Sequence, residues 1–143
     1  MTPIEVFEST LAKIRNAVKA CVNELAVFND AAARVAKSLA LVNETKLALN
    51  TLRQAATECP GEATEEGYKA AVISSEKHLT ACIENHELSQ AVMGEIKAGA
   101  MASCEIVANG LNALQSFCLN DQHRADVDAL MAEISECQAA LRD

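Results

Sequence analysis

The chain has 143 residues, which suffices for one domain with a sizeable core, and 50% of them are apolar although only 3% are aromatic. Its formal net charge is −8 and its lysines and arginines are scattered singly, so it offers no basic surface for nucleic acid and should be repelled by anionic membranes. No apolar run approaches the ~20 residues that a bilayer span requires. These properties argue against nucleic-acid binding and against a membrane span.

Alanine contributes 27 residues, and there is no tryptophan. Alanine is the best helix former and allows helices to approach closely, whereas sheets favour β-branched and aromatic residues. The two prolines, Pro3 and Pro60, both lie at expected helix ends. The composition predicts an all-α protein, a single domain over residues 1–143 built as an antiparallel bundle of about five helices.

The first expected helix begins at Thr2-Pro3-Ile4-Glu5, a capping box with proline at the first helical position. Apolar residues then recur at alternating steps of three and four, which is typical of a helix with one inward face. Asn29 or Asp30 should end this helix, and a second should run to Cys59-Pro60-Gly61. The expected inward residues are Ile4, Phe7, Leu11, Ile14, Val18, Cys21, Leu25 and Phe28, then Val35, Leu39, Val42, Leu49, Leu52 and Cys59.

A third helix is expected from about Ala63 or Thr64, with a weak break at residues 85–87, where it could instead run on into the fourth with a kink. A fifth should begin at Asn120-Asp121. Three glycines within the fourth helix, Gly94, Gly99 and Gly110, indicate close helix packing or, alternatively, a hinge. The inward residues are Tyr68, Val72, Ser75, Leu79 and Cys82; Val92, Ile96, Ala100, Cys104, Val107, Leu111, Leu114 and Cys118; and Val127, Leu130, Ile134, Cys137 and Leu141.

All six cysteines fall at inward positions, and no two form a CxxC pair, which disfavours zinc-finger, thioredoxin and iron–sulfur sites. They are either free buried thiols of a cytosolic protein or three disulfides of a secreted helical bundle. The polar start MTPIEVFEST is not a signal peptide, which is compatible with secretion if the chain is a mature form. We expect a disulfide-linked, secreted, extracellular protein.

Helix geometry selects a set of disulfide pairs if five helices alternate up and down. Cys59 and Cys118 both come just before a turn at one end of such a bundle. A helix rises about 1.5 Å per residue, so positions along the bundle axis follow from the distance to the nearest turn. On this basis Cys104 and Cys137 differ by only ~3 Å along the axis, and Cys21 and Cys82 by ~6 Å. The predicted disulfides are Cys21–Cys82, Cys59–Cys118 and Cys104–Cys137.

His78, Cys82 and His86 recur at steps of four and raise the question of a zinc site. The two histidines are ~12 Å apart along a helix axis, and zinc–nitrogen bonds are only ~2 Å long, so they cannot readily share one ion. His123 is near neither of them in sequence. We expect no metal site and no cofactor.

Catalytic machinery is not recognisable either. Residues 74–76 (Ser-Ser-Glu) and His78 have the types needed for nucleophilic catalysis, but one helix spreads them around its surface. No nucleophile elbow, phosphate-binding glycine loop or paired-carboxylate motif occurs, so we expect a protein that is not an enzyme. Asn43-Glu44-Thr45 matches the glycosylation sequon and would support secretion if occupied, although it lies within an expected helix.

The widely spaced cysteines Cys21, Cys59, Cys82, Cys104, Cys118 and Cys137, with the alanine- and leucine-rich helical texture between them, resemble secreted insect helical domains of the tsetse EP type. The resemblance covers nearly the whole chain but includes no diagnostic motif. It implies an extracellular, non-enzymatic protein of gut or body fluid, and no binding residue can be carried over from it.

Two functions fit these features: a carrier of a small apolar ligand such as a fatty acid or lipid, or a secreted protein-interaction module, an inhibitor or immune factor, that acts through an exposed helix face. Methionines and small residues could line an adaptable cavity in a carrier, or could only serve helix packing. A carrier should enclose the ligand between the third, fourth and fifth helices, with a lysine at the rim for a carboxylate. The predicted ligand-binding residues are Val92, Met93, Ile96, Lys97, Met101, Leu130 and Met131.

Overall fold

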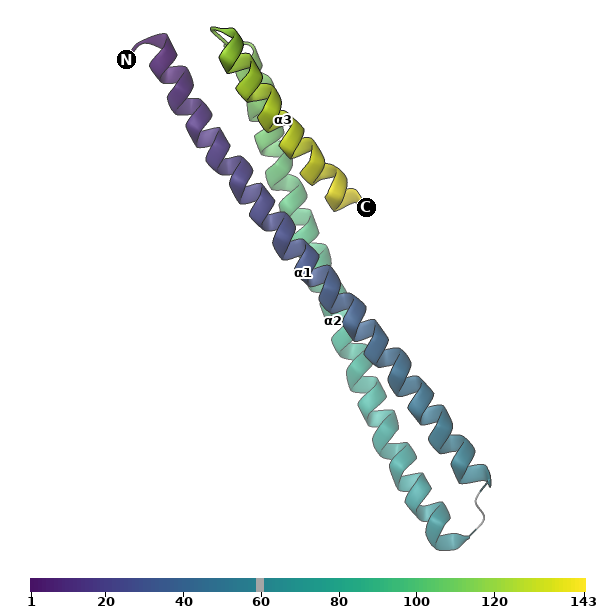
Figure 1. Cartoon of the computed structure of the whole chain (residues 1–143). Helices are drawn as coiled ribbons and strands as arrows, with labels where there is room; N and C mark the ends of the chain where they lie inside the picture. Colours follow the sequence, from purple (N-terminus) through teal and green to yellow (C-terminus); the bar gives the residue numbers. More distant parts are fainter. Residues whose placement is uncertain (59–60) are drawn as a thin grey trace. The chain divides into compact units, whose positions relative to one another are not determined.

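The computed structural model describes residues 1–58 and 61–143, without the side chains of residues 62–64. The described chain forms three helices: α1 (Pro3–Glu58), α2 (Glu62–Gln115) and α3 (Asp121–Arg142) (Figure 1). No strand occurs in these residues, so the expected all-α class is confirmed.

The helix ends follow the local signals that the sequence carries. Thr2 Oγ1 accepts a hydrogen bond from the Glu5 amide at 3.2 Å, as a cap should. The stop expected at Cys59-Pro60-Gly61 is confirmed, since α1 ends at Glu58 and α2 begins at Glu62, and Gly61 has a φ of 151°, which favours glycine. The Asn120 side chain caps α3 by accepting from the His123 amide at 2.8 Å.

The expectation of about five helices is wrong, because the chain stays helical at two predicted breaks. Helix α1 continues through Asn29 and Asp30. Helix α2 continues through residues 85–87, which is the alternative that the weak break at this point left open. Neither segment contains proline or glycine. Asparagine, aspartate and histidine lower helix propensity by less than about 1 kcal/mol each, which packing along the rest of a helix readily offsets.

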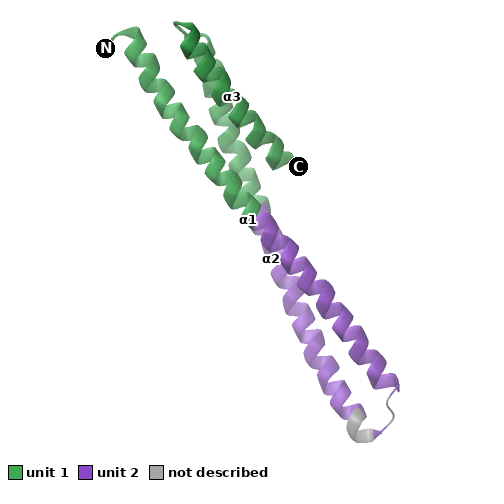
Figure 2. Ribbon diagram, in the orientation of Figure 1, with its two compact units in different colours: residues 1–30, 94–143 green, residues 31–93 purple. Residues whose placement is uncertain are grey.

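The chain divides into two compact units, where sequence analysis assigned residues 1–143 to one domain. Unit 1 contains residues 1–30 and 94–143, and unit 2 contains residues 31–93 (Figure 2). Helices α1 and α2 each contribute one part to each unit, whereas α3 belongs to unit 1 alone.

Unit 1 is a three-helix unit with one continuous core. The inward faces predicted for its helices meet there, and Val18, Leu111, Val127 and Leu141 have no exposed surface. Ile4 was expected to point inward but is 48% exposed. The buried members of this core are Phe7, Leu11, Val18, Cys21, Ala100, Cys104, Leu111, Leu114, Val127, Leu130, Ile134, Cys137 and Leu141.

Unit 2 pairs residues 31–58 of α1 with residues 62–93 of α2, which run antiparallel. Its inward face is more polar than the sequence pattern indicated, because Ser38 and Thr45 are buried while Leu39 and Val92, both expected inside, are 46% and 44% exposed. The other described buried residues of unit 2 are Ala31, Val42, Leu49 and Cys82.

Candidate functional site

The seven residues predicted to line a single ligand cavity are dispersed in the structure. Val92 and Met93 belong to unit 2, and the other five belong to unit 1. Leu130 is buried in the core of unit 1, and Met131 packs against that core. Ile96 and Met101 line two different pockets, and Lys97 lines none of the four pockets considered below.

The largest of these pockets in unit 1 is a surface groove between the first turns of α1 and the last turns of α2, with a volume of about 690 Å³. Phe7 and Leu114, both nearly fully buried, form its floor, while Val6 and Phe117 are 49% and 67% exposed. We call this pocket the apolar groove. It is lined by Met1, Pro3, Val6, Phe7, Thr10, Ile14, Gly110, Ala113, Leu114, Phe117 and Leu119.

The other two helix pairs of unit 1 form grooves of a different character. The groove between α1 and α3 is lined by Glu8, Arg15 and Asp126 among others, and the groove between α2 and α3 includes Glu105 and Arg142. Charged side chains keep such grooves hydrated, because removing a charge from water is unfavourable. The apolar groove has no charged side chain among its lining residues, so it is the groove of this unit suited to an apolar occupant.

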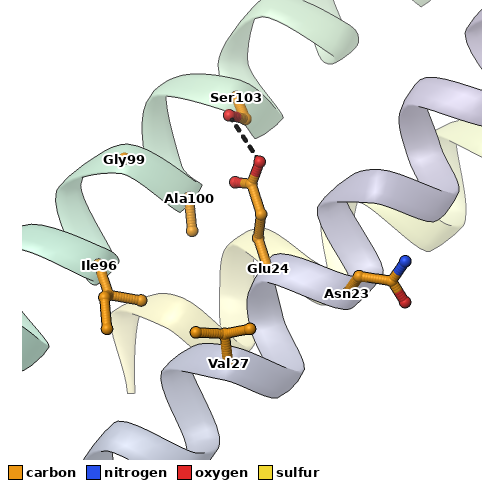
Figure 3. Close-up of a pocket in the computed structure, with 7 residues that line it drawn as sticks. All are labelled: Asn23, Glu24, Val27, Ile96, Gly99, Ala100 and Ser103. Atoms are coloured by element: carbon orange, nitrogen blue, oxygen red, sulfur yellow. Dashed lines mark hydrogen bonds between the residues drawn. The ribbon is translucent and has the colours of Figure 1, made fainter.

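A second pocket between α1 and α2 has a volume of about 410 Å³ and is centred on Glu24, and we call it the Glu24 pocket (Figure 3). The Ser103 hydroxyl donates to Glu24 Oε1 at 3.2 Å, while Glu24 Oε2 is buried and has no hydrogen-bond partner. Val27 and Ile96 face the same space from the two helices, as the close-up shows. The remaining lining residues are Asn23, Gly99 and Ala100.

Three thiols, one from each helix of unit 1, meet in the core: Cys21, Cys104 and Cys137 are at most 4% exposed. Burial raises the pKa of the Cys21 thiol to about 12, and Cys104 and then Glu24 contribute to the same shift. The pKa of Cys137 is also raised, first by burial and then by Cys104. The neutral thiol is therefore the favoured form in this cluster, which we call the thiol cluster.

The predicted disulfides are not present among the described residues. Cys21, Cys82, Cys104, Cys118 and Cys137 are free thiols, so the Cys21–Cys82 and Cys104–Cys137 bonds are absent. The third predicted bond, Cys59–Cys118, involves Cys59, which lies outside the described residues. These pairs were predicted for a bundle of five helices, whereas the described residues form three. With α1 continuous through residue 30, Cys21 lies within unit 1 and interacts with Cys104, while Cys82 lies within unit 2.

In unit 2, the residues considered for zinc make polar contacts instead. His86 Nδ1 lies 2.7 Å from Ser38 Oγ on α1, whereas Cys82 Sγ lies 3.6 Å from His78 Nε2 and 3.9 Å from Thr45 Oγ1. The two histidines thus have different neighbours. Over the described residues, no group of three or more His, Cys, Asp or Glu side chains is arranged to hold a metal ion. None of the helices, in the part of the chain described, combines the length and apolar character that crossing a bilayer requires.

Sequence analysis missed both pockets. A signal for the apolar groove exists, since Val6 and Thr10 on α1, and Ala113 on α2 with Phe117 just after it, recur at steps of four beside the predicted inward positions. The Glu24 pocket carries no such signal. Its key contact joins residues 24 and 103, and only the relative register of α1 and α2 brings them together.

No protein-family model matches this sequence, and neither a curated protein nor a solved structure shows significant similarity to it. The resemblance to tsetse EP-type domains therefore stays a prediction.

Proposed function

We propose that the protein is a non-enzymatic binding protein that carries a small apolar ligand, such as a fatty acid or lipid, in the apolar groove of unit 1. The observation that carries this proposal is the composition of the groove. Of the eleven residues that line it, Thr10 alone has a polar side chain. A volume of about 690 Å³ falls within the ~300–1,000 Å³ of small-molecule sites.

The exposed apolar side chains at the rim also support the proposal. Val6, Phe117 and Leu119 are each about half exposed or more, and they border the same groove. An apolar chain lying between them would remove this surface from water, which is favourable by about 25 cal/mol per Å² buried. Leu130 belongs to the core and Met131 packs against it, so neither of these predicted ligand contacts lines this groove.

A second candidate is an interaction module whose groove receives an amphipathic helix from a protein partner. The observation that favours it is the presence of Gly110 and Ala113 along the α2 side of the groove, since small residues let another helix approach closely. An inhibitor or immune factor would act in this way. The predicted extracellular location rests on the disulfides, the resemblance to tsetse EP-type domains and the sequon at Asn43. Neither candidate function requires it.

The test of the carrier is binding of the neutral fluorescent probe N-phenyl-1-naphthylamine to the folded protein. We expect one saturable site per chain and displacement of the probe by dodecanoate. Ala113→Trp should fill the groove and weaken probe binding at least tenfold. Ala102→Trp is the matched control, since Ala102 is an exposed alanine on the same helix that lines the groove between α2 and α3.

Three outcomes would count against the carrier. Absence of saturable probe binding would exclude an apolar ligand of this size. Equal weakening by Ala113→Trp and Ala102→Trp would show that the probe does not report on the apolar groove. Probe binding that dodecanoate cannot displace would leave the amphipathic helix as the better candidate.

A further inference from the structure

The Glu24 pocket is chemically unlike the apolar groove and is separate from it in lining residues. Val27, Ile96 and Ala100 give it apolar walls, and its floor carries one carboxylate (Figure 3). A Cβ added at Gly99 would meet nothing within 4 Å, so the α2 wall leaves open space at this point. The pocket therefore combines room for a small apolar group with a fixed negative charge.

The carboxylate of Glu24 is only half satisfied by the protein. Oε1 accepts from Ser103, but Oε2 is shielded from solvent without a hydrogen-bond donor, and Glu24 takes part in no ion pair with the described residues. A buried carboxylate oxygen without a partner is unfavourable, and a donor that carries positive charge would relieve it most.

We propose that the Glu24 pocket is a second binding site, which takes a protonated amine attached to a small apolar group. An ammonium group is compact and has three donors. One can bond to Glu24 Oε2. A second can bond to Ser103 Oγ, which keeps acceptor capacity because its own hydrogen goes to Glu24. The apolar part of the ligand lies against Val27 and Ile96.

This site reverses the charge preference expected from the sequence. Ile96 was predicted to contact a fatty acid whose carboxylate would pair with Lys97, yet the pocket that Ile96 lines contains a carboxylate of its own. A fatty acid there would be repelled by Glu24, whereas an amine of the same length would be attracted. The inference does not depend on the apolar groove, and either site can fail without the other.

The experiment compares three probes with the same six-carbon chain: n-hexylammonium, hexan-1-ol and hexanoate. Binding is followed by calorimetry and by NMR shifts of the Gly99 and Ser103 amides. We expect n-hexylammonium to bind at least tenfold more tightly than hexan-1-ol, and hexanoate to show no saturable binding. Equal affinities for the ammonium and the alcohol would overturn the proposal.

Variants test whether n-hexylammonium binds in the Glu24 pocket. Glu24→Gln keeps the shape but removes the charge, and it should reduce n-hexylammonium affinity to that of hexan-1-ol. Glu105→Gln, an exposed glutamate outside the pocket, should leave it unchanged. Gly99→Leu should fill the pocket and abolish binding, whereas Gly94→Leu, at a helical glycine outside the pocket that also has open space, should not. Undiminished n-hexylammonium affinity in Glu24→Gln, or retained binding in folded Gly99→Leu, would overturn the proposal.

Discussion

At the scale of single residues, the thiol cluster is the most unusual part of the core. Cys21 and Cys137 have raised pKa values chiefly because they are buried, and Cys104 lies close enough to both to contribute to each shift. A thiol is a small apolar group when neutral, so it packs in a core without a charged partner. The thiolate, in contrast, is the reactive form, and burial suppresses it.

The first prediction concerns thiol reactivity. In folded protein at pH 8, iodoacetamide should alkylate Cys21 and Cys137 at least about 100-fold more slowly than Cys118, which is partly exposed near the end of α2. Peptide mass spectrometry gives the rate at each cysteine. All three should react readily after denaturation without reductant. Cysteines that remain unlabelled under those conditions would indicate disulfides and would support the predicted secretion.

The second prediction concerns stability at high pH. Cys21 has a pKa of about 12 when folded and an ordinary value of 9.0, so the unfolded chain loses this proton first as pH rises. The stability from the neutral thiol is complete below pH 9 and is lost as pH rises through 12, at about 1.4 kcal/mol per pH unit for one group. Urea denaturation of wild type and Cys21→Ala between pH 8 and 11 measures the free energy of unfolding, which should fall more steeply with pH in wild type. The same pH dependence in both proteins would contradict it.

At the scale of helices, both local sequence signals and tertiary packing decide where a helix begins and ends. The sequence Pro60-Gly61 predicted the end of α1, which lies at Glu58, and Asn120 caps α3. Asn29-Asp30 did not end a helix, because these residues lower helix propensity only weakly. The segments before and after them both have an inward apolar face, and packing of these faces stabilises one continuous helix. The proline–glycine signal therefore predicted a helix end correctly, whereas an Asn-Asp pair marks a helix boundary at residues 120–121 but not at residues 29–30.

The cap of α3 can be tested directly. Asn120→Ala removes the acceptor for the His123 amide and should lower the free energy of unfolding by about 1 kcal/mol. Asn112→Ala, at an exposed position within α2, is the control and should not lower it. Chemical denaturation measures the free energy of unfolding of both variants and of wild type. An Asn120→Ala variant as stable as wild type would show that the cap contributes nothing.

Alanine substitutions at Gly94 and Gly99 of α2, and at Gly61 before it, should change the stability in opposite directions. Close helix packing, one interpretation of the sequence, is wrong for Gly94 and Gly99, since a Cβ at either would meet nothing within 4 Å. Gly94→Ala and Gly99→Ala should each raise the free energy of unfolding by up to about 1 kcal/mol through helix propensity. Gly61→Ala should lower it, because its φ of 151° strains other residues. Urea denaturation measures all three, and a destabilising Gly99→Ala would contradict this account.

At the scale of the whole molecule, the two units differ in how their cores are built. Unit 1 buries a continuous set of apolar side chains from three helices. Unit 2, over its described residues, buries four apolar residues together with the polar Ser38 and Thr45. The Ser38 hydroxyl donates to Val35 O at 2.8 Å and the Thr45 hydroxyl donates to Leu41 O at 2.7 Å, so both are hydrogen-bonded. These two side chains nevertheless contribute less hydrophobic stabilisation than leucine would.

Unit 2 should therefore open more readily than unit 1. We expect amides of residues 42–49 in α1 to exchange with deuterium at least about tenfold faster than amides of residues 11–21 in the same helix. Exchange monitored by mass spectrometry at pH 7 compares the two segments within one chain, so each serves as the reference for the other. Equal protection along α1 would show that the polar residues do not weaken unit 2.

Much of the inward pattern was predictable from spacing alone. All five residues expected inside α3 are buried, namely Val127, Leu130, Ile134, Cys137 and Leu141. The errors are at Ile4, Leu39 and Val92, which a helical period also allows at the edge of an apolar face. Ser38 lies inside instead of its neighbour Leu39, because the partner helix brings His86 against that position. Periodicity defines a face only broadly, and the neighbouring helix selects the buried residues within it.

The helical class, the end of α1 and the inward face of α3 could be predicted from the sequence, because they depend on interactions within a few residues. Tertiary packing brings Cys21 against Cys104 and Glu24 to Ser103. It also leaves an apolar groove open beside Val6 and Phe117. Such contacts join residues far apart in the chain, and the continuity of α1 and α2 sets the register that brings them together.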